Sequence, residues 1–178
     1  MPRPSTNLRI TVAQTRNGLG LVATRPFRTN ETIIKLAGRV VDAGVLWKRG
    51  GTFADNCIRF GPETYLDPGD GPGRYLNHSC EPTAAVRKDN NQLFLFAARP
   101  IRSADDITID YSTTLGDDDI WTMRCNCGHR SCRGRIKRFG SLPPALEQDY
   151  VARGMVPTYI IKTLGWRLGH SSSRSRAD

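Results

Sequence analysis

The sequence predicts a mostly β domain that is rich in loops and carries a helical extension at its C-terminal end. Three observations predict this fold class. Apolar residues occur in short runs, and the first of them alternates with polar residues as in a half-buried strand. The connections between the runs are rich in glycine, proline and aspartate. Helical spacing of apolar residues begins only late in the chain. With 178 residues, 38% hydrophobic and 24% charged, the chain can form one domain with its own core.

The first expected strand contains Leu8, Ile10 and Val12, which alternate with polar residues and therefore point to one side. The glycine-containing stretch 17–20 interrupts this strand, and an apolar run resumes after it. The further strands expected comprise residues 21–23, 33–36, 40–41, 93–97 and 107–109. Residues 67–73 contain three glycines and two prolines, which indicates a loop. Two helices are expected at residues 145–152 and 159–164.

The chain is basic, with 26 Lys and Arg residues against 17 Asp and Glu residues and a formal net charge of +9. A basic surface attracts nucleic acid, acidic proteins or anionic headgroups, although a solvated surface accounts for the same charge.

No run of eighteen apolar residues is present, and the first residues lack the apolar core of a secretory signal. We therefore expect no membrane association.

Three of the five cysteines have the spacing Cys125-x-Cys127-xxxx-Cys132. This spacing suits a metal ion better than disulfides, and it favours a reducing compartment such as the cytoplasm. A structural zinc site takes four tetrahedral ligands, so one ligand must come from elsewhere. The candidates for this fourth ligand are Cys80, Cys57 and His129.

Two polar or glycine-rich motifs add candidate ligand contacts. Gly18-Leu19-Gly20 could let backbone amides approach a ligand closely, but two glycines often only form a turn. Asn77-His78-Ser79 offers side chains that can bind the amine and carboxylate of a polar ligand, but such residues also form locally satisfied turns. Each motif alone is ambiguous.

In combination the motifs resemble those of SET-domain protein lysine methyltransferases with a zinc-binding post-SET segment. The resemblance extends from about residue 8 to residue 134 and is carried by four stretches, Gly18-Leu19-Gly20, Arg74-Tyr75-Leu76-Asn77-His78-Ser79-Cys80-Glu81-Pro82, Ile107-Thr108-Ile109-Asp110-Tyr111 and Cys125-Asn126-Cys127-Gly128-xxx-Cys132-Arg133-Gly134. It implies a fold of small twisted β-sheets around a knot-like crossing. No cysteine cluster precedes the domain, which makes it a minimal module similar to bacterial or viral members.

The resemblance also implies the cofactors and the roles of single residues. S-adenosylmethionine would bind on one face, and a protein or peptide substrate would present its lysine from the opposite face. Tyr111 would be the catalytic residue, and Cys80 would be the fourth ligand of a structural zinc ion beside Cys125, Cys127 and Cys132. The residues implied in cofactor binding are Gly18, Leu19, Gly20, Arg74, Tyr75, Asn77 and His78.

The resemblance suggests a division of the chain into an N-terminal lead (1–7), the SET domain (8–112), the post-SET zinc segment (121–137), a helical extension (138–170) and a disordered tail (171–178). A cytoplasmic location is expected, or a host nucleus or chromatin location for a eukaryotic, viral or effector protein. The substrate could be a histone or another basic protein.

Some positions depart from the family pattern. Ile109 stands where relatives often carry Phe or Tyr, which favours di- or trimethylation, and Leu36 stands where many carry Tyr. Two other classes of function stay open. One is a catalytically silent SET module that binds peptides, and the other is a basic zinc-containing DNA-binding protein. The second alternative would use basic residues of the zinc segment and its flank, Arg133, Arg135, Lys137 and Arg138.

Overall fold

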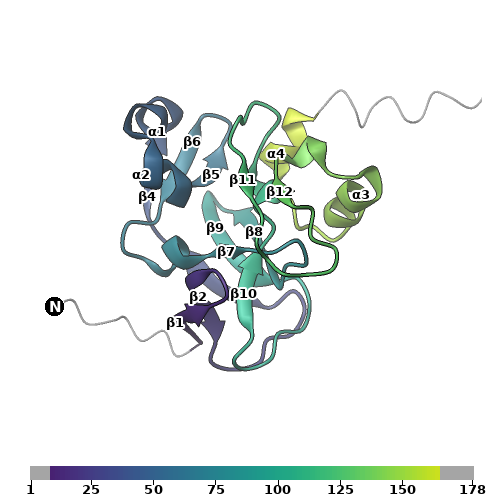
Figure 1. Cartoon of the computed structure of the whole chain (residues 1–178). Helices are drawn as coiled ribbons and strands as arrows, with labels where there is room; N and C mark the ends of the chain where they lie inside the picture. The colour runs from purple at the N-terminus through teal and green to yellow at the C-terminus, as the bar shows by residue number, and fades with distance from the viewer. Residues whose placement is uncertain (1–8, 165–178) are drawn as a thin grey trace, which may run out of the picture.

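A computed structural model describes residues 9–164, which form four small β-sheets with helices at two corners (Figure 1). The first sheet contains β1 (Ile10–Thr15), β2 (Gly18–Ala23), β10 (Asp106–Ile109) and β7 (Asn77–His78), in the order β1-β2-β10-β7. β1 and β2 form an antiparallel hairpin, and β2 pairs antiparallel with β10. β10 and β7 are parallel, with Thr108 opposite Asn77 and Ile109 opposite His78.

Two three-stranded antiparallel sheets and one two-stranded sheet complete the β structure. One sheet has the order β3-β9-β8, from β3 (Thr32–Leu36), β9 (Gln92–Ala97) and β8 (Ala84–Asp89). Another has the order β4-β6-β5, from β4 (Arg39–Asp42), β6 (Thr64–Asp67) and β5 (Ile58–Gly61). The smallest sheet pairs β11 (Met123–Arg124) with β12 (Arg135–Ile136), and its strands bracket the three clustered cysteines.

The helices occupy the two upper corners of Figure 1. Two short helices, α1 (Ala43–Arg49) and α2 (Gly51–Asn56), stand beside the β4-β6-β5 sheet. The C-terminal extension contains α3 (Pro144–Ala152) and α4 (Thr158–Thr163) on the opposite side. Short 3-10 turns, η1 (Pro72–Tyr75), η2 (Tyr111–Thr114) and η3 (Phe139–Ser141), connect strands and helices. No helix within residues 9–164 is long and apolar enough to cross a bilayer.

Two hydrophobic cores hold these layers together. The larger core packs apolar residues of the strands, and Leu21, Val86, Leu95 and Ile107 are at most 1% exposed. The second core lies between the extension and the outer face of β8 and β9, and its members include Phe96, Phe139, Met155 and Ile160. The extension is therefore packed on the domain over a continuous buried surface. At about 25 cal/mol per Å2, such apolar burial is the main term that stabilises a fold of this size.

The mostly β fold class is confirmed, and so are the expected helices at residues 145–152 and 159–164, which correspond to α3 and α4. The expectation that residues 17–20 interrupt the first strands was wrong at Gly18, because β2 already begins there. Ile10 and Val12 were expected on one side of the first strand, and they differ in burial, with Ile10 6% and Val12 40% exposed. The strands β5, β6 and β8 and the helices α1 and α2 were not predicted. The N-terminal lead 1–7, residues 165–170 of the predicted extension and the tail 171–178 lie outside the described residues.

Candidate active site

The site is built where two segments far apart in the sequence cross. The short strand β7 lies parallel to the end of β10, which brings Asn77-His78 against Ile109-Asp110-Tyr111. The Ser79 backbone N–H donates to the Ile109 carbonyl at 2.9 Å, which extends the pairing by one residue. The His78 Nδ1 accepts a hydrogen bond of 3.2 Å from the Tyr111 backbone N–H. The crossing thus fixes the orientation of Tyr111 relative to the Asn-His-Ser motif.

Tyr111 is half-buried, and its hydroxyl donates a hydrogen bond of 2.6 Å to the Leu76 carbonyl. Its ring lies 5.4 Å from the His78 ring and 6.1 Å from the Trp121 ring, measured between centroids. Burial, together with the charge of Asp55, raises the pKa of Tyr111 to about 12. The phenol is therefore protonated at neutral pH, and its oxygen lone pairs can accept a hydrogen bond or face a positive charge.

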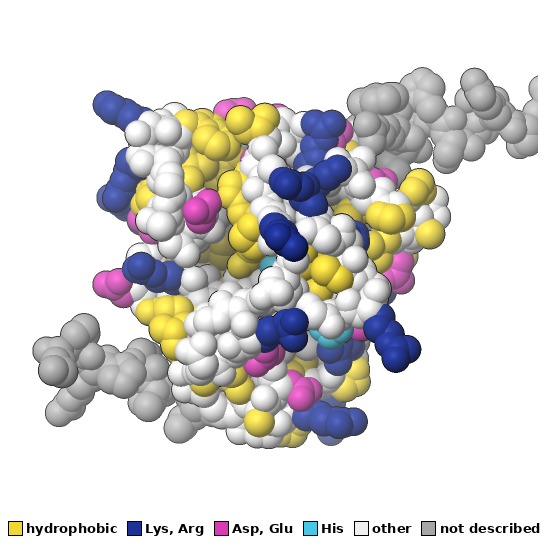
Figure 2. Space-filling model, in the orientation of Figure 1, with side chains coloured by type: hydrophobic (Ala, Val, Ile, Leu, Met, Phe, Trp, Pro, Cys, Tyr) yellow, Lys and Arg dark blue, Asp and Glu magenta, His cyan; other side chains and the backbone are white. Residues whose placement is uncertain are grey.

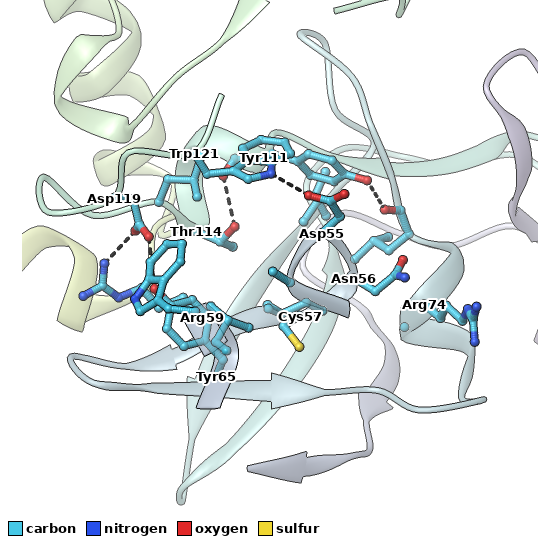
Figure 3. Close-up of a pocket in the computed structure, with 18 residues that line it drawn as sticks. Asp55, Asn56, Cys57, Arg59, Tyr65, Arg74, Tyr111, Thr114, Asp119 and Trp121 are labelled. Atoms are coloured by element: carbon cyan, nitrogen blue, oxygen red, sulfur yellow. Dashed lines mark hydrogen bonds and ion pairs between the residues drawn. The ribbon is translucent and has the colours of Figure 1, made fainter. Parts of the chain in front are cut away.

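Two cavities meet at Tyr111. The first, called the enclosed cavity, lies between α1–α2, β5, η1 and residues 114–121 (Figure 3). The second, called the open cavity, is lined by the turn of the first hairpin, by β7 and by β11. Tyr111 lines both cavities, and so do Asp55, Asn56 and Trp121. The two cavities therefore lie on either side of a shared set of residues that includes Tyr111.

The enclosed cavity is largely apolar and has one buried ionic wall. Its apolar lining residues include Leu46, Ile58, Leu76, Ile109 and Leu115. The ionic wall is Arg59, which is 2% exposed and donates to Asp119 at 2.6 Å and to Asp118 at 2.7 Å. The Tyr65 hydroxyl also donates to Asp119, at 3.0 Å. The two carboxylates thus balance and fix this arginine, as a buried charge requires, and the phenol holds one of them in place.

Gly20 lies at a close approach of side chains, which is an observation beside the backbone contact that its motif suggested. A Cβ atom at this position would lie 2.6 Å from the Asn77 Nδ2 and 2.7 Å from the Thr15 Cγ2, so no side chain fits. Because Gly20 has none, the Asn77 amide reaches across β2 and donates to the Leu19 carbonyl at 3.2 Å. The close approach at this glycine is therefore to Asn77, whose side chain is held at the wall of the open cavity.

The four cysteines Cys80, Cys125, Cys127 and Cys132 gather at one point, with their sulfur atoms within 4.8 Å of one another. The Cys80 and Cys125 sulfurs are 3.7 Å apart. A tetrahedral zinc ion with Zn–S distances of about 2.3 Å would place its sulfurs about 3.8 Å apart, so the four thiols fit the ion. Backbone N–H groups of Cys127, Arg133 and Gly134 donate to these sulfurs at 3.4 Å, as expected for thiolate ligands.

The cysteine cluster touches the crossing through His78. The Nε2 of His78 lies 3.4 Å from the Cys80 sulfur. Since Nδ1 accepts from the Tyr111 backbone, the proton of the neutral ring belongs on Nε2, where it points at the sulfur. Burial lowers the pKa of His78 to about 4, although the Asp110 carboxylate acts in the opposite direction. One neutral imidazole therefore connects the metal-ligand set to Tyr111.

Asp110 connects the crossing to the C-terminal part of the chain. This buried carboxylate accepts hydrogen bonds from Arg133 at 2.7 Å, from the Tyr150 hydroxyl at 3.1 Å and from the Ser112 backbone at 3.1 Å. The Tyr159 hydroxyl of α4 donates to the Arg59 carbonyl on the wall of the enclosed cavity. The extension thus supports the site at two places, and neither contact was predicted.

A family model of the SET domain matches residues 18–112, which is more than half of the chain. The chain belongs to the SET-domain family. The cysteine cluster follows the SET match in sequence, apart from Cys80 inside it, and is compatible with a post-SET zinc site.

Curated relatives carry similar sequences over most of this chain. A "Histone-lysine N-methyltransferase, H3 lysine-36 specific" from Cryptococcus neoformans is 31% identical over 133 residues, which are 68% of this chain and 16% of the relative. A protein of the same description from Yarrowia lipolytica is 25% identical over 135 residues, which are 69% of this chain and 17% of the relative. This SET chain therefore spans about a sixth of the length of these relatives.

Solved structures share the fold. The methyltransferase domain of human histone-lysine N-methyltransferase SETMAR superposes with a TM-score of 0.58 at 24% identity, covering 72% of this chain and 58% of that one. The structure of KRYPTONITE in complex with mCHG DNA and SAH superposes with a TM-score of 0.57 at 23% identity. The match covers 72% of this chain and 29% of the KRYPTONITE chain. At these identities the likeness establishes the SET fold.

The site residues named from sequence fall into two groups. Asn77, His78 and Tyr111 line the open cavity together, and Leu19 is bonded to Asn77 beside it. Arg74 instead lines the enclosed cavity, and Tyr75 packs against the main core. Polar or charged lining residues that were not named as site residues include Arg16, Asn17, Asp55, Asn56 and Arg59. They lie in the hairpin turn, in α2 and in β5, none of which carries a family motif.

Proposed function

We propose that this SET domain transfers a methyl group from S-adenosylmethionine to a lysine side chain of a protein. The observation that carries this proposal is the position of Tyr111, which lines both the enclosed cavity and the open cavity together with Asp55, Asn56 and Trp121. Methyl transfer to an amine is an in-line displacement, which needs the two reactants to approach from opposite sides. Two cavities that share a wall at Tyr111 support this arrangement.

The enclosed cavity would bind the lysine side chain. Its aliphatic lining matches the methylene stem, and its low polarity disfavours the charged ammonium. Lysine attacks only as the neutral amine, although its ordinary pKa is about 10.4. Tyr111 would accept a hydrogen bond from the amine or face the positive charge near it, because its phenol oxygen keeps free lone pairs beside the bond to Leu76.

The open cavity would bind S-adenosylmethionine, which supplies the methyl group on a sulfonium sulfur. Asn77 and His78 line this cavity, and the backbone of Gly18, Leu19 and Gly20 runs beside them. We keep Tyr75 and Arg74 among the proposed contacts on the family resemblance alone. The position of Arg74 at the enclosed cavity gives its contact no support.

Zinc is the proposed occupant of the cysteine cluster, with Cys80, Cys125, Cys127 and Cys132 as ligands. Four thiols at tetrahedral spacing support zinc over harder cations, which prefer oxygen ligands. Its role is structural, because all four positions would be filled by protein. The ligand Cys80 adjoins the Asn-His-Ser motif, so the ion would hold the post-SET segment against the crossing.

The proposed substrate is a histone or a basic histone-like protein, as the descriptions of the relatives suggest. A histone substrate would place the chain at chromatin, whereas a ribosomal or other basic protein is compatible with the cytoplasm. Ile109 lines the enclosed cavity and is smaller than Phe or Tyr, which supports di- or trimethylation. Arg and Lys side chains gather over the β11–β12 segment (Figure 2), and a nucleic-acid contact there is a second proposal.

The test is methyl transfer from labelled S-adenosylmethionine to a histone mixture and to a lysine-rich protein extract. We expect label on lysine, identified by mass spectrometry, and a reduction of turnover by about 100-fold in Tyr111→Phe. The affinity for S-adenosylmethionine, measured by calorimetry, should change little in this variant. Cofactor and peptide binding without transfer would instead support a catalytically silent module, and salt-sensitive DNA binding alone would support the DNA-binding alternative.

A further inference from the structure

The enclosed cavity contains one carboxylate whose charge is not balanced. Four charged side chains line this cavity, Asp55, Arg59, Arg74 and Asp119. Arg59 and Asp119 neutralise each other at 2.6 Å, with Asp118 as a further partner of Arg59. Arg74 is exposed at the rim and faces Asp70 at 3.6 Å. Asp55 has no cationic partner among residues 9–164.

Asp55 lines both cavities, and its side chain lies beside Trp121 and Tyr111 (Figure 3). One oxygen of its carboxylate accepts the indole N–H of Trp121 at 2.8 Å, and this neutral donor leaves the negative charge in place. The negative charge of Asp55 also contributes to the raised pKa of the Tyr111 phenol. The second carboxylate oxygen has no hydrogen-bond donor among the described residues.

We propose that Asp55 is a specificity-determining residue that attracts the substrate lysine, as its ammonium ion, to the mouth of the enclosed cavity. This inference rests on the proposed function. The cavity combines an aliphatic wall, the Trp121 and Tyr111 rings and one unpaired carboxylate, which are the groups that recognise an alkylammonium ion. Deeper in the cavity the apolar lining favours the neutral amine. Asp55, being exposed, is in contact with water that can receive the proton.

Trp121 positions Asp55 and is also part of the same recognition. It lies four residues before Cys125, whereas Asp55 is on α2, so the 2.8 Å hydrogen bond joins the cysteine-bearing segment to the helix. With the indole holding one oxygen, the carboxylate is fixed beside the cavity although the residue is exposed. The conservative variant Asp55→Asn keeps an oxygen that can accept this hydrogen bond and removes only the charge.

A binding experiment tests the site without catalysis. The chain, zinc-loaded and labelled with 15N, is titrated with n-butylammonium chloride and separately with 1-butanol, and the indole N–H signal of Trp121 is followed by NMR. We expect a saturable shift with the ammonium ion and little shift with the alcohol. Asp55→Asn should abolish the shift, and Asp89→Asn, which removes a charge at the distant β8–β9 turn, should retain it. Equal responses of wild type and Asp55→Asn would overturn the proposal.

A kinetic experiment separates this proposal from the proposed function. For the peptide around the lysine that mass spectrometry identifies, Asp55→Asn should raise KM by about tenfold while the KM for S-adenosylmethionine is unchanged. Asp55→Asn should also reduce the ratio of the binding affinities for this peptide and for a peptide with norleucine in place of the lysine. If Asp55→Asn transfers methyl groups with an unchanged peptide KM and an unchanged affinity ratio, the role of Asp55 is refuted and the methyltransferase function is not. Ammonium binding that depends on Asp55, without any transfer, refutes the methyltransferase function alone.

Discussion

At the scale of single residues, the geometry of the site depends on a glycine, because residue 20 has no Cβ atom. Asn77 crosses β2 at Gly20, and its amide donates to the Leu19 carbonyl and to the Thr15 hydroxyl. Any Cβ at residue 20 would displace this amide, because its nearest neighbours would be under 3 Å away. The glycine at the end of the Gly18-Leu19-Gly20 motif therefore positions Asn77.

We accordingly expect Gly20→Ala to weaken the binding of S-adenosylmethionine by about tenfold, since one or two hydrogen bonds that orient Asn77 would be lost. Calorimetry with the purified chain measures this change. Gly44→Ala is the matched control, because a Cβ at residue 44 meets nothing within 4 Å. Equal affinities of the two variants would show that the position of Asn77 does not matter for the cofactor.

At the scale of elements, one carboxylate joins the first hairpin to the second sheet. Glu31 immediately precedes β3 and accepts hydrogen bonds from Arg9 at 2.8 Å and from Arg25 at 2.6 Å, which flank the β1–β2 hairpin. The Arg28 backbone N–H donates to its other oxygen. The hydrogen bond from Arg25 is the main reason that the pKa of Glu31 falls to about 2.

This shift predicts an acid-sensitive contact. The folded-state pKa lies below the ordinary value of 4.5, so the unfolded chain binds the proton more readily. Its contribution to the free energy of unfolding is complete above pH 4.5 and is lost as the pH falls towards 2. Thermal unfolding at a series of pH values should show this loss as a decrease of Tm at low pH. The decrease should be smaller in Glu31→Gln. An identical pH dependence in the variant would contradict the assignment.

The extension gives a second prediction at this scale. Tyr150→Phe removes the hydrogen bond from α3 to the buried Asp110 carboxylate, which keeps Arg133 and Ser112 as partners. We expect a loss of about 1.5 kcal/mol in the free energy of unfolding and a decrease of roughly 4 °C in Tm. Tyr75→Phe is the control, since the Tyr75 hydroxyl makes no hydrogen bond within residues 9–164. Equal Tm values for the two variants would show that the hydrogen bond of the Tyr150 hydroxyl does not stabilise the fold.

At the scale of the whole molecule, the cysteine cluster connects parts that the sheets leave separate. Cys80 belongs to the crossing, and the other three cysteines belong to the segment between β11 and β12. We expect one zinc ion per chain by mass spectrometry of the metal. Removal by a chelator should abolish methyl transfer and lower Tm, while the β-sheet signal in circular dichroism stays largely intact.

Single variants define this zinc prediction further. Cys127→Ser should lose the zinc ion, because three ligands cannot complete the tetrahedral site. Cys57→Ser should keep a full equivalent, because Cys57 lines the enclosed cavity and is not part of the cluster. If Cys127→Ser keeps one zinc ion per chain, Cys127 is not a ligand of the ion.

Much of this architecture could be predicted, since motifs are local in sequence and strands show their apolar runs. The parts that could not be predicted lack such signals. Helix α1 buries only Leu46 and α2 buries no residue, so neither has an apolar face to detect. The roles of Asp55 and Arg59 depend on partners 59 to 66 residues away, and no spacing in the sequence indicates those contacts.

The parallel pairing of β7 with β10 has a consequence for the order in which the site forms during folding. Its partners are 31 residues apart, and β10 pairs with β2 across 84 to 86 residues, whereas the partners within the β1–β2 and β8–β9 hairpins are at most 13 residues apart. Contacts between distant residues form slowly, whereas hairpins close early. During refolding we therefore expect both hairpins to form before β10 takes its place between β2 and β7. A newly synthesised chain would then contain much of its strand structure before Tyr111 reaches the Asn-His-Ser motif.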